Sequence, residues 1–213
     1  KKLLKVIDTN NYGGTSGKYW NSAGTNNWST ASLKTELNGT YLTTLLGTSN
    51  VNGKLSSGIA NAKWHLGGGS SSNYQTLTTE GIYTEERNTN AIYSGNPSNI
   101  YAKVGLMYPS DYGYATSGGT SMNRESCLAT ILYDWDTARD CKNNDWLLDS
   151  SNIQWTLTPN TDSTNVFDVD DTGYVTYSSH AYALRSVWPS VYLIPSTFIF
   201  GGEGTLENPY EIW

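Results

Sequence analysis

The sequence predicts an α+β fold in which antiparallel strands and long ordered loops dominate and helices are short. Charged residues make up only 15% of the 213 residues, so the Lys, Glu and Arg that cover helical surfaces are few. Eight Trp and sixteen Tyr favour strands and supply a large area for burial. Abundant Asn, Gly, Ser and Thr favour turns and loops.

Apolar runs bounded by turn residues predict the strands. In chain order these are residues 3–8, 102–108, 146–148, 155–157, 166–169, 174–177 and 190–194. The fifth and sixth flank Asp170-Asp171-Thr172-Gly173, whose Asp and Gly residues suit the turn of a hairpin. The same acidic run is also compatible with a calcium loop. That interpretation is the weaker one, because an EF-type loop needs Glu at its twelfth position and this chain has Ser179 there.

One helical stripe precedes these strands. Leu33, Leu37, Tyr41 and Leu45 recur at a spacing of four, which predicts a helix over residues 29–45. Asn38-Gly39 interrupts the stripe, so we expect either two short helices or one helix with a strained middle. Residues 67–73 (GGGSSSN) predict a flexible loop.

The chain shows no internal repeat, and we expect a single domain over residues 1–213, with an N-terminal strand and loop over 1–27. The net charge is −6 and no basic cluster occurs, which makes nucleic acid a poor partner. No apolar run approaches the roughly 20 residues that span a bilayer. We therefore expect no membrane contact by this segment.

The two cysteines, Cys127 and Cys141, have two interpretations. A disulfide would close a small loop and stabilise the fold by roughly 3 kcal/mol. It would also suit an exported protein, located outside the cell or on its surface. The alternative is two independent buried thiols. Pairing and compartment together favour the disulfide.

The sequence favours a binding protein over an enzyme. Histidine is limited to His65 and His180, and neither has metal-ligand spacing. His65 precedes a glycine run and reads as a loop histidine. We therefore predict no catalytic residues, no metal ligands and no cofactor.

Two segments are candidate ligand-binding patches. In the first, aromatic residues alternate with carboxylates: Tyr133, Asp134, Trp135 and Asp136. Rigid rings give contact area at low entropic cost, and carboxylates accept hydrogen bonds from sugar hydroxyls. The alternation fits equally well a strand-like segment whose rings fill the core while its carboxylates face water. The second patch comprises Tyr177, His180 and Tyr182.

Several motifs occur in an order that resembles a bacterial cell-surface family. Trp28 is followed by Leu33-Lys34-x-x-Leu37-Asn38-Gly39-x-Tyr41, which looks like the first helix of that family. The other matching segments are residues 105–112, 144–147 with 155–159, 166–175, 183–193, and 201–205 with 208–210. The resemblance covers residues 28–213. One departure is Trp188, which stands where the family usually has Arg before Pro; Arg185 is near but faces the other side of a strand.

The resemblance implies a C-type-lectin-like fold, related to formylglycine-generating enzymes, with antiparallel twisted sheets and one or two short helices. It implies a non-enzymatic adhesion or ligand-binding module on a bacterial surface, whose partner is a glycan or a protein on another cell. Relatives include pilin-like proteins, so a structural subunit of a filament built from copies of the chain is the alternative. A formylglycine-generating-type oxidase is a weaker alternative.

Overall fold

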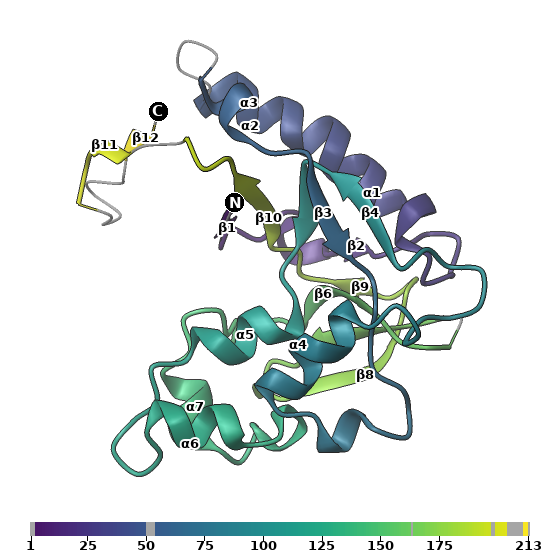
Figure 1. Ribbon diagram of the computed structural model, residues 1–213, viewed down its shortest axis with the longest axis vertical. Coiled ribbons are helices and arrows are strands. Elements are labelled where there is room, and N and C mark those ends of the chain that lie inside the picture. The colour runs from purple at the N-terminus through teal and green to yellow at the C-terminus, as the bar shows by residue number, and fades with distance from the viewer. Residues whose placement is uncertain (1–2, 50–53, 163, 197–198, 204–210, 213) are drawn as a thin grey trace.

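The computed structural model describes residues 3–49, 54–162, 164–196, 199–203 and 211–212. It confirms the mixed α+β class, with several antiparallel sheets and short helices (Figure 1). The strands are β1 (Leu4–Ile7), β2 (Lys18–Tyr19), β3 (Ala62–His65), β4 (Asn99–Ala102), β5 (Val104–Leu106), β6 (Gln154–Pro159), β7 (Asn165–Val169), β8 (Val175–His180), β9 (Leu184–Arg185), β10 (Pro189–Leu193), β11 (Ile199–Gly201) and β12 (Glu211–Ile212). The helices are α1 (Ser32–Glu36), α2 (Leu42–Ser49), α3 (Lys54–Gly58), α4 (Thr79–Arg87), α5 (Pro109–Ala115), α6 (Arg124–Ala129) and α7 (Arg139–Asn143).

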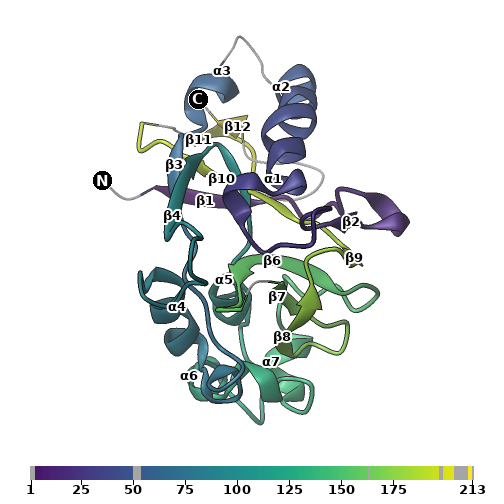
Figure 2. The same ribbon diagram turned by 90° about the vertical axis from the view of Figure 1, so that its right-hand side faces the viewer.

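Pairing between distant strands organises the middle of the molecule. Strand β1 pairs with β10, and β10 pairs with β5, both antiparallel. A second three-stranded sheet has the order β6-β7-β8. Helices α1 to α3 lie with β3 and β4 toward one end of the molecule, while α4 to α7 lie toward the other (Figures 1 and 2).

Two hydrophobic clusters meet at β5 and the chain that follows it. Leu106 and Tyr108 are buried in the first cluster, with Trp20, Trp64 and Trp155. Met107 faces the second cluster, which contains both cysteines, Trp135 and Phe167. Side chains on extended backbone alternate between opposite faces, so this one segment contributes to both clusters.

The interrupted helical stripe is confirmed, and the interruption positions Asn38 to bond to the backbone of a neighbouring segment. Leu33 and Leu37 are fully buried, and the chain between α1 and α2 forms a π-helical turn, Leu37–Tyr41, at the Asn38-Gly39 step. The turn lets the Asn38 side chain accept from the amides of Lys103 and Val104, at 3.1 and 3.0 Å. The same side chain donates to the Val104 carbonyl at 2.9 Å. Asn38 thus satisfies backbone groups where β4 gives way to β5.

The hairpin over residues 166–177 is also confirmed. Strands β7 and β8 pair antiparallel. Asp170 Oδ1 accepts from the Thr172 amide at 2.9 Å and from its hydroxyl at 2.8 Å, while Gly173 has φ 97°. Asp and Gly therefore serve the turn, as the hairpin interpretation requires.

Two local predictions are wrong. Residues 146–148 form a turn instead of a strand, because Asp145 Oδ1 accepts from the Leu147 amide at 2.8 Å and bends the chain. Gly67, Gly68 and Gly69 are buried, so this loop is packed. A Cβ at Gly67 or Gly68 would collide with the carbonyl oxygens of Glu85 or Pro159, which explains the glycines by close backbone approach.

Helices are more numerous than the one or two expected, mainly because residues 79–143 contain four of them, α4 to α7. The helices in this region are short, and two of them begin with side-chain caps: Thr78 accepts from Gly81 N at the start of α4, and Asn123 accepts from Ser126 N at the start of α6. These caps are spread through a polar sequence whose apolar stripe is weak. That weakness hides the helices from pattern analysis.

Candidate functional site

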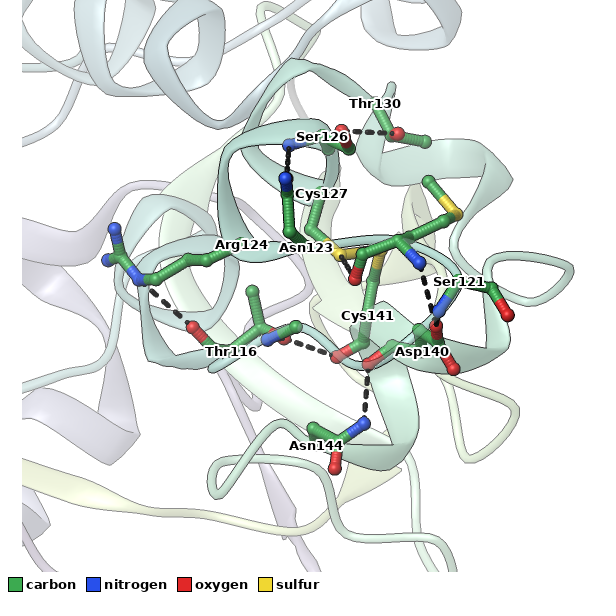
Figure 3. Close-up of a disulfide and its surroundings, with 12 residues drawn as sticks. Thr116, Ser121, Asn123, Arg124, Ser126, Cys127, Thr130, Asp140, Cys141 and Asn144 are labelled. Atoms are coloured by element: carbon green, nitrogen blue, oxygen red, sulfur yellow. Dashed lines mark hydrogen bonds between the residues drawn. A yellow bond between two sulfur atoms is a disulfide. The ribbon is translucent and has the colours of Figure 1, made fainter.

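A disulfide fixes the loop that carries the first candidate patch. Cys127 in α6 and Cys141 in α7 are bonded, with Cα atoms 5.4 Å apart, and both are fully buried. Hydrogen bonds brace both ends of the bridge (Figure 3). The Thr116 hydroxyl donates to the Cys141 carbonyl at 2.6 Å, and Asp140 Oδ2 accepts from the Met122 amide at 2.7 Å. The predicted disulfide is therefore confirmed.

The first patch divides between core and surface. Trp135 is fully buried and packs against Tyr112, with ring centroids 5.3 Å apart. Asp134 and Asp136 are exposed, and Tyr133 is half-buried. The prediction that Trp135 contacts ligand is therefore wrong, because its ring lies in the core. The other interpretation of the alternating pattern, in which rings fill the core and carboxylates face water, describes Trp135 and its two neighbours.

Tyr133 joins three other tyrosines at the surface. Its ring lies 5.0 Å from Tyr74 and 5.6 Å from Tyr174, measured between centroids. Tyr74 also packs on Tyr177, with centroids 4.2 Å apart. All four side chains are partly exposed. We call this set, Tyr74, Tyr133, Tyr174 and Tyr177, the tyrosine cluster.

Long-range pairing assembles the tyrosine cluster. Thr78 and Ile131 form an antiparallel bridge, and the Leu132 amide donates to the Leu77 carbonyl at 3.0 Å. This pairing brings the short helical turn of Tyr74 beside that of Tyr133. The hairpin of β7 and β8 supplies Tyr174 and Tyr177. Sequence reasoning found Tyr133 and Tyr177 and missed Tyr74 and Tyr174; the position of Tyr174 next to a predicted hairpin turn was the one available signal.

Carboxylates border the cluster and affect its hydroxyl groups. Partial burial, and then the negative charges of Asp170 and Asp168, raise the pKa of Tyr174 above its ordinary value. Burial and the neighbouring Tyr133 raise the pKa of Tyr74. Both hydroxyls therefore stay protonated at neutral pH and can donate hydrogen bonds.

One lysine ties the disulfide loop to the hairpin turn. Lys142 Nζ donates to the Asp136 carbonyl at 2.6 Å and to the Thr172 carbonyl at 2.8 Å. The two segments that carry Tyr133 and Tyr174 are thus linked by a single side chain. This link and the disulfide together join the segments that carry Tyr133 and Tyr174.

The second predicted patch is split. Tyr177 belongs to the tyrosine cluster, whereas His180 and Tyr182 stack on each other, with centroids 5.3 Å apart and planes inclined by 9°. His180 is exposed and Tyr182 is 55% exposed. The register of β7 and β8 shifts between the pair Val166 with Ser179 and the pair Asp168 with Thr176, in the part of β8 that contains Tyr177, so the patch is divided by its ring contacts and not by strand alternation.

His65 is not in a loop, as the sequence suggested, but at the end of β3. Burial, followed by the charges of Arg87 and Lys63, lowers its pKa. Its backbone carbonyl accepts from the Tyr108 hydroxyl at 3.0 Å.

An ion pair joins the buried carboxylate of Asp168, in β7, to the partly exposed guanidinium of Arg185. Asp168 Oδ2 is 3.6 Å from Arg185 Nε, and it also accepts from the Ser179 hydroxyl. Burial raises the pKa of Asp168 to about 7, although Ser179 and Arg185 oppose the shift. Trp188 is buried in the second hydrophobic cluster. Trp188 therefore contributes an indole to the core, while Arg185 contacts Asp168 in β7 and Ser179 in β8.

A polar pocket of about 230 Å³ borders the same hairpin turn. Its lining includes the small residues 14–17, together with Asn152, Asp171 and Arg185. Amide, carboxylate and guanidinium groups in one shallow hollow can exchange hydrogen bonds with a polyhydroxylated ligand. Among the described residues, no three His, Cys, Asp or Glu side chains are grouped in a way that could hold a metal ion.

Comparison with known protein families, with characterised proteins and with solved structures finds no match for this chain. In the part of the chain that the structure describes, no helix has both the length and the apolar character needed to cross a membrane.

Proposed function

We propose that this chain is a non-enzymatic module, displayed outside a bacterial cell, that binds a glycan through the tyrosine cluster. The observation that carries the proposal is the convergence of four partly exposed tyrosine rings from three separate chain segments. Exposed Asp134 and Asp136 adjoin them in the disulfide loop. No single stretch of sequence assembles this surface.

The chemistry of the cluster suits a carbohydrate. Aromatic faces offer apolar area to the C–H groups of a sugar ring, while phenol hydroxyls and carboxylates exchange hydrogen bonds with its hydroxyls. The rings are held by one another, and the disulfide and Lys142 hold the segments that carry them. A surface fixed in advance loses less conformational entropy on binding.

A C-type-lectin-like fold is part of this proposal. Antiparallel sheets, short helices and long packed loops support it. So does the pairing of β1 with β10, which brings the beginning of the chain beside a late strand.

Two observations favour binding over catalysis. The only two histidines are separated, with His65 in β3 and His180 at the end of β8 stacked on Tyr182. The weaker alternative, a formylglycine-generating-type oxidase, relies on reactive thiols. Here both cysteines are buried and bonded to each other.

A second candidate function, a structural subunit of a surface filament, is favoured by β1. This strand lies at the edge of its sheet, and Leu4 and Val6 are 59% and 43% exposed. An edge strand with exposed apolar side chains is a template for pairing with another chain. If the chain is a filament subunit, Val6→Lys should prevent the assembly that light scattering detects. If the chain is a glycan-binding module, the same substitution should leave glycan binding unchanged.

A glycan array tests the principal proposal. We expect the wild-type chain to bind a subset of glycans and Tyr74→Ala to lose that binding, because Tyr74 contacts two other rings of the cluster. Tyr101→Ala is the matched control, since Tyr101 is 65% exposed on β4 and lies outside the cluster. Equal binding by both variants, or binding to no glycan, would exclude the proposal.

A further inference from the structure

A lysine amine is held against a carboxylate beneath three aromatic rings. Lys5 lies in β1, and its side chain is only 13% exposed. Its Nζ is 4.4 Å from the ring centroid of Tyr108, 5.2 Å from that of Trp64 and 5.6 Å from that of Tyr192. This enclosure strips most water from the amine and leaves it few polar partners.

The partner of the amine is Asp111, in the first turn of α5. Lys5 Nζ contacts Asp111 Oδ2 directly, and its other acceptor is the Leu106 carbonyl at 3.4 Å. Asp111 Oδ2 also accepts from the Tyr108 amide at 2.6 Å. The pairing of β1 with β10 fixes the backbone at Lys5, and the Tyr108 amide fixes the carboxylate. Amine and carboxyl carbon are therefore held in one orientation.

A second buried carboxylate stands beside this pair. Glu86 is fully buried and accepts from the Ser110 amide at 2.9 Å and from its hydroxyl at 2.6 Å. Ser110 immediately precedes Asp111, so Glu86 positions the turn that carries the reacting carboxyl. Burial raises the pKa of Glu86 to about 7, while burial lowers the pKa of Lys5.

We propose that Lys5 and Asp111 join in an intramolecular amide cross-link, formed by the folded chain itself. The Lys5 nitrogen attacks Asp111 Cγ, a C–N bond forms, and one C–O bond of the carboxyl group breaks. Of the three hydrogens on the ammonium group, two leave with the departing oxygen as water and one remains on the amide nitrogen. The step needs no oxidant, reductant or further reactant.

The surroundings favour each part of this step. A desolvated amine more readily gives up a proton and becomes a nucleophile. The Tyr108 N–H is aimed at Oδ2 and stabilises negative charge on that oxygen when nitrogen attacks. Holding both groups in contact replaces a bimolecular encounter with an intramolecular one. A pocket of about 230 Å³, lined by Lys5, Asp111 and Trp146 among others, gives the released water a path to solvent.

The test is the mass of the purified folded protein after reduction and denaturation. We expect the intact mass to be lower than that of the sequence by one water molecule. Trypsin should then fail to cut after Lys5 and should yield residues 3–18 covalently joined to residues 104–124. A full sequence mass, together with release of the free peptide 3–5, would overturn the proposal and leave an ordinary ion pair.

The chain contains its own matched control. Lys18 and Glu36 also form a lysine–carboxylate pair, at 2.6 Å and beside the Tyr12 ring, but both side chains are 33% exposed. Trypsin should cut normally after Lys18. The variant Lys5→Arg retains the positive charge and should show the full mass of its sequence. Loss of water in Lys5→Arg would place the cross-link elsewhere and contradict the assignment.

Discussion

The rings of Tyr74 and Tyr177 pack with centroids 4.2 Å apart and planes inclined by 56°. Tyr74 belongs to a short helical turn, Tyr74–Thr76, and Tyr177 lies within β8. Their contact joins the loop after the buried glycines to the hairpin, and it brings two edges of the tyrosine cluster together.

This contact predicts different effects for the ring and the hydroxyl of Tyr177. Tyr177→Ala should weaken glycan binding about tenfold or more, equivalent to about 1.4 kcal/mol. Tyr177→Phe keeps the ring and should weaken binding less. Isothermal titration with a glycan identified on the array measures both. An equal loss in the two variants would show that the hydroxyl, and not the aromatic face, carries the interaction.

Trp135 should matter for stability rather than for binding. Trp135→Ala should lower the free energy of unfolding by roughly 3–5 kcal/mol, because it removes a fully buried ring from the second hydrophobic cluster. Trp135→Phe should cost less, since the indole N–H has no hydrogen-bond partner among the described residues. Denaturant titration measures both values.

The control for this prediction is Trp146→Ala. Trp146 is 60% exposed, so its removal should change stability by about 0.5 kcal/mol or less. A larger loss for Trp146→Ala than for Trp135→Ala would contradict the placement of the two rings.

The disulfide should stabilise the fold and the tyrosine cluster together. Replacing both cysteines by serine should lower the free energy of unfolding by roughly 3 kcal/mol in the chain-entropy model. The cluster should become more mobile, because α6 and α7 lose their covalent link. Thermal unfolding with and without reductant checks the first effect. An unchanged melting temperature under full reduction would contradict it.

Asp145 should make stability depend on pH. Burial raises its pKa to about 8, and its Oδ2 has no hydrogen-bond partner among the described residues. The folded state therefore holds a proton that the unfolded state has released, between about pH 4 and pH 8. Stability should fall as pH rises through this window, by at most about 1.4 kcal/mol per pH unit for one proton.

Asp145→Asn should remove this contribution, so its unfolding free energy should vary less with pH than that of the wild type. Glu86 and Asp168 have raised pKa values too, and they contribute a remaining slope of the same sign. Identical pH profiles for the variant and the wild type would show that Asp145 does not titrate as described.

Local patterns predicted the parts of the fold that local chemistry determines. The stripe through Leu33 and Leu37 gave the interrupted helix, and the Asp170–Gly173 turn gave the hairpin. Alternation around Trp135 could not distinguish a core ring from a displayed ring, because both interpretations have the same period. The structure distinguishes the two interpretations, because Trp135 is buried and packs against Tyr112.

The candidate site was only partly predictable for a different reason. Tyr133 and Tyr177 were found from their own neighbours in sequence. Tyr74 joins them through the bridge between Thr78 and Ile131, a contact between residues that no local pattern connects. The glycine run likewise predicts flexibility, whereas Gly67 and Gly68 are required by close approach to the backbones of α4 and β6.

We propose that the tyrosine cluster is the surface that binds the glycan. Spectra of the tyrosine ring protons, assigned by single Tyr→Phe variants and recorded during titration with a bound glycan, test it most directly. If the tyrosine cluster binds the glycan, the signals of Tyr74, Tyr133, Tyr174 and Tyr177 should shift together and saturate at one concentration. Unmoved signals from these four rings, with shifts confined to Tyr182 or to the pocket beside Arg185, would contradict it.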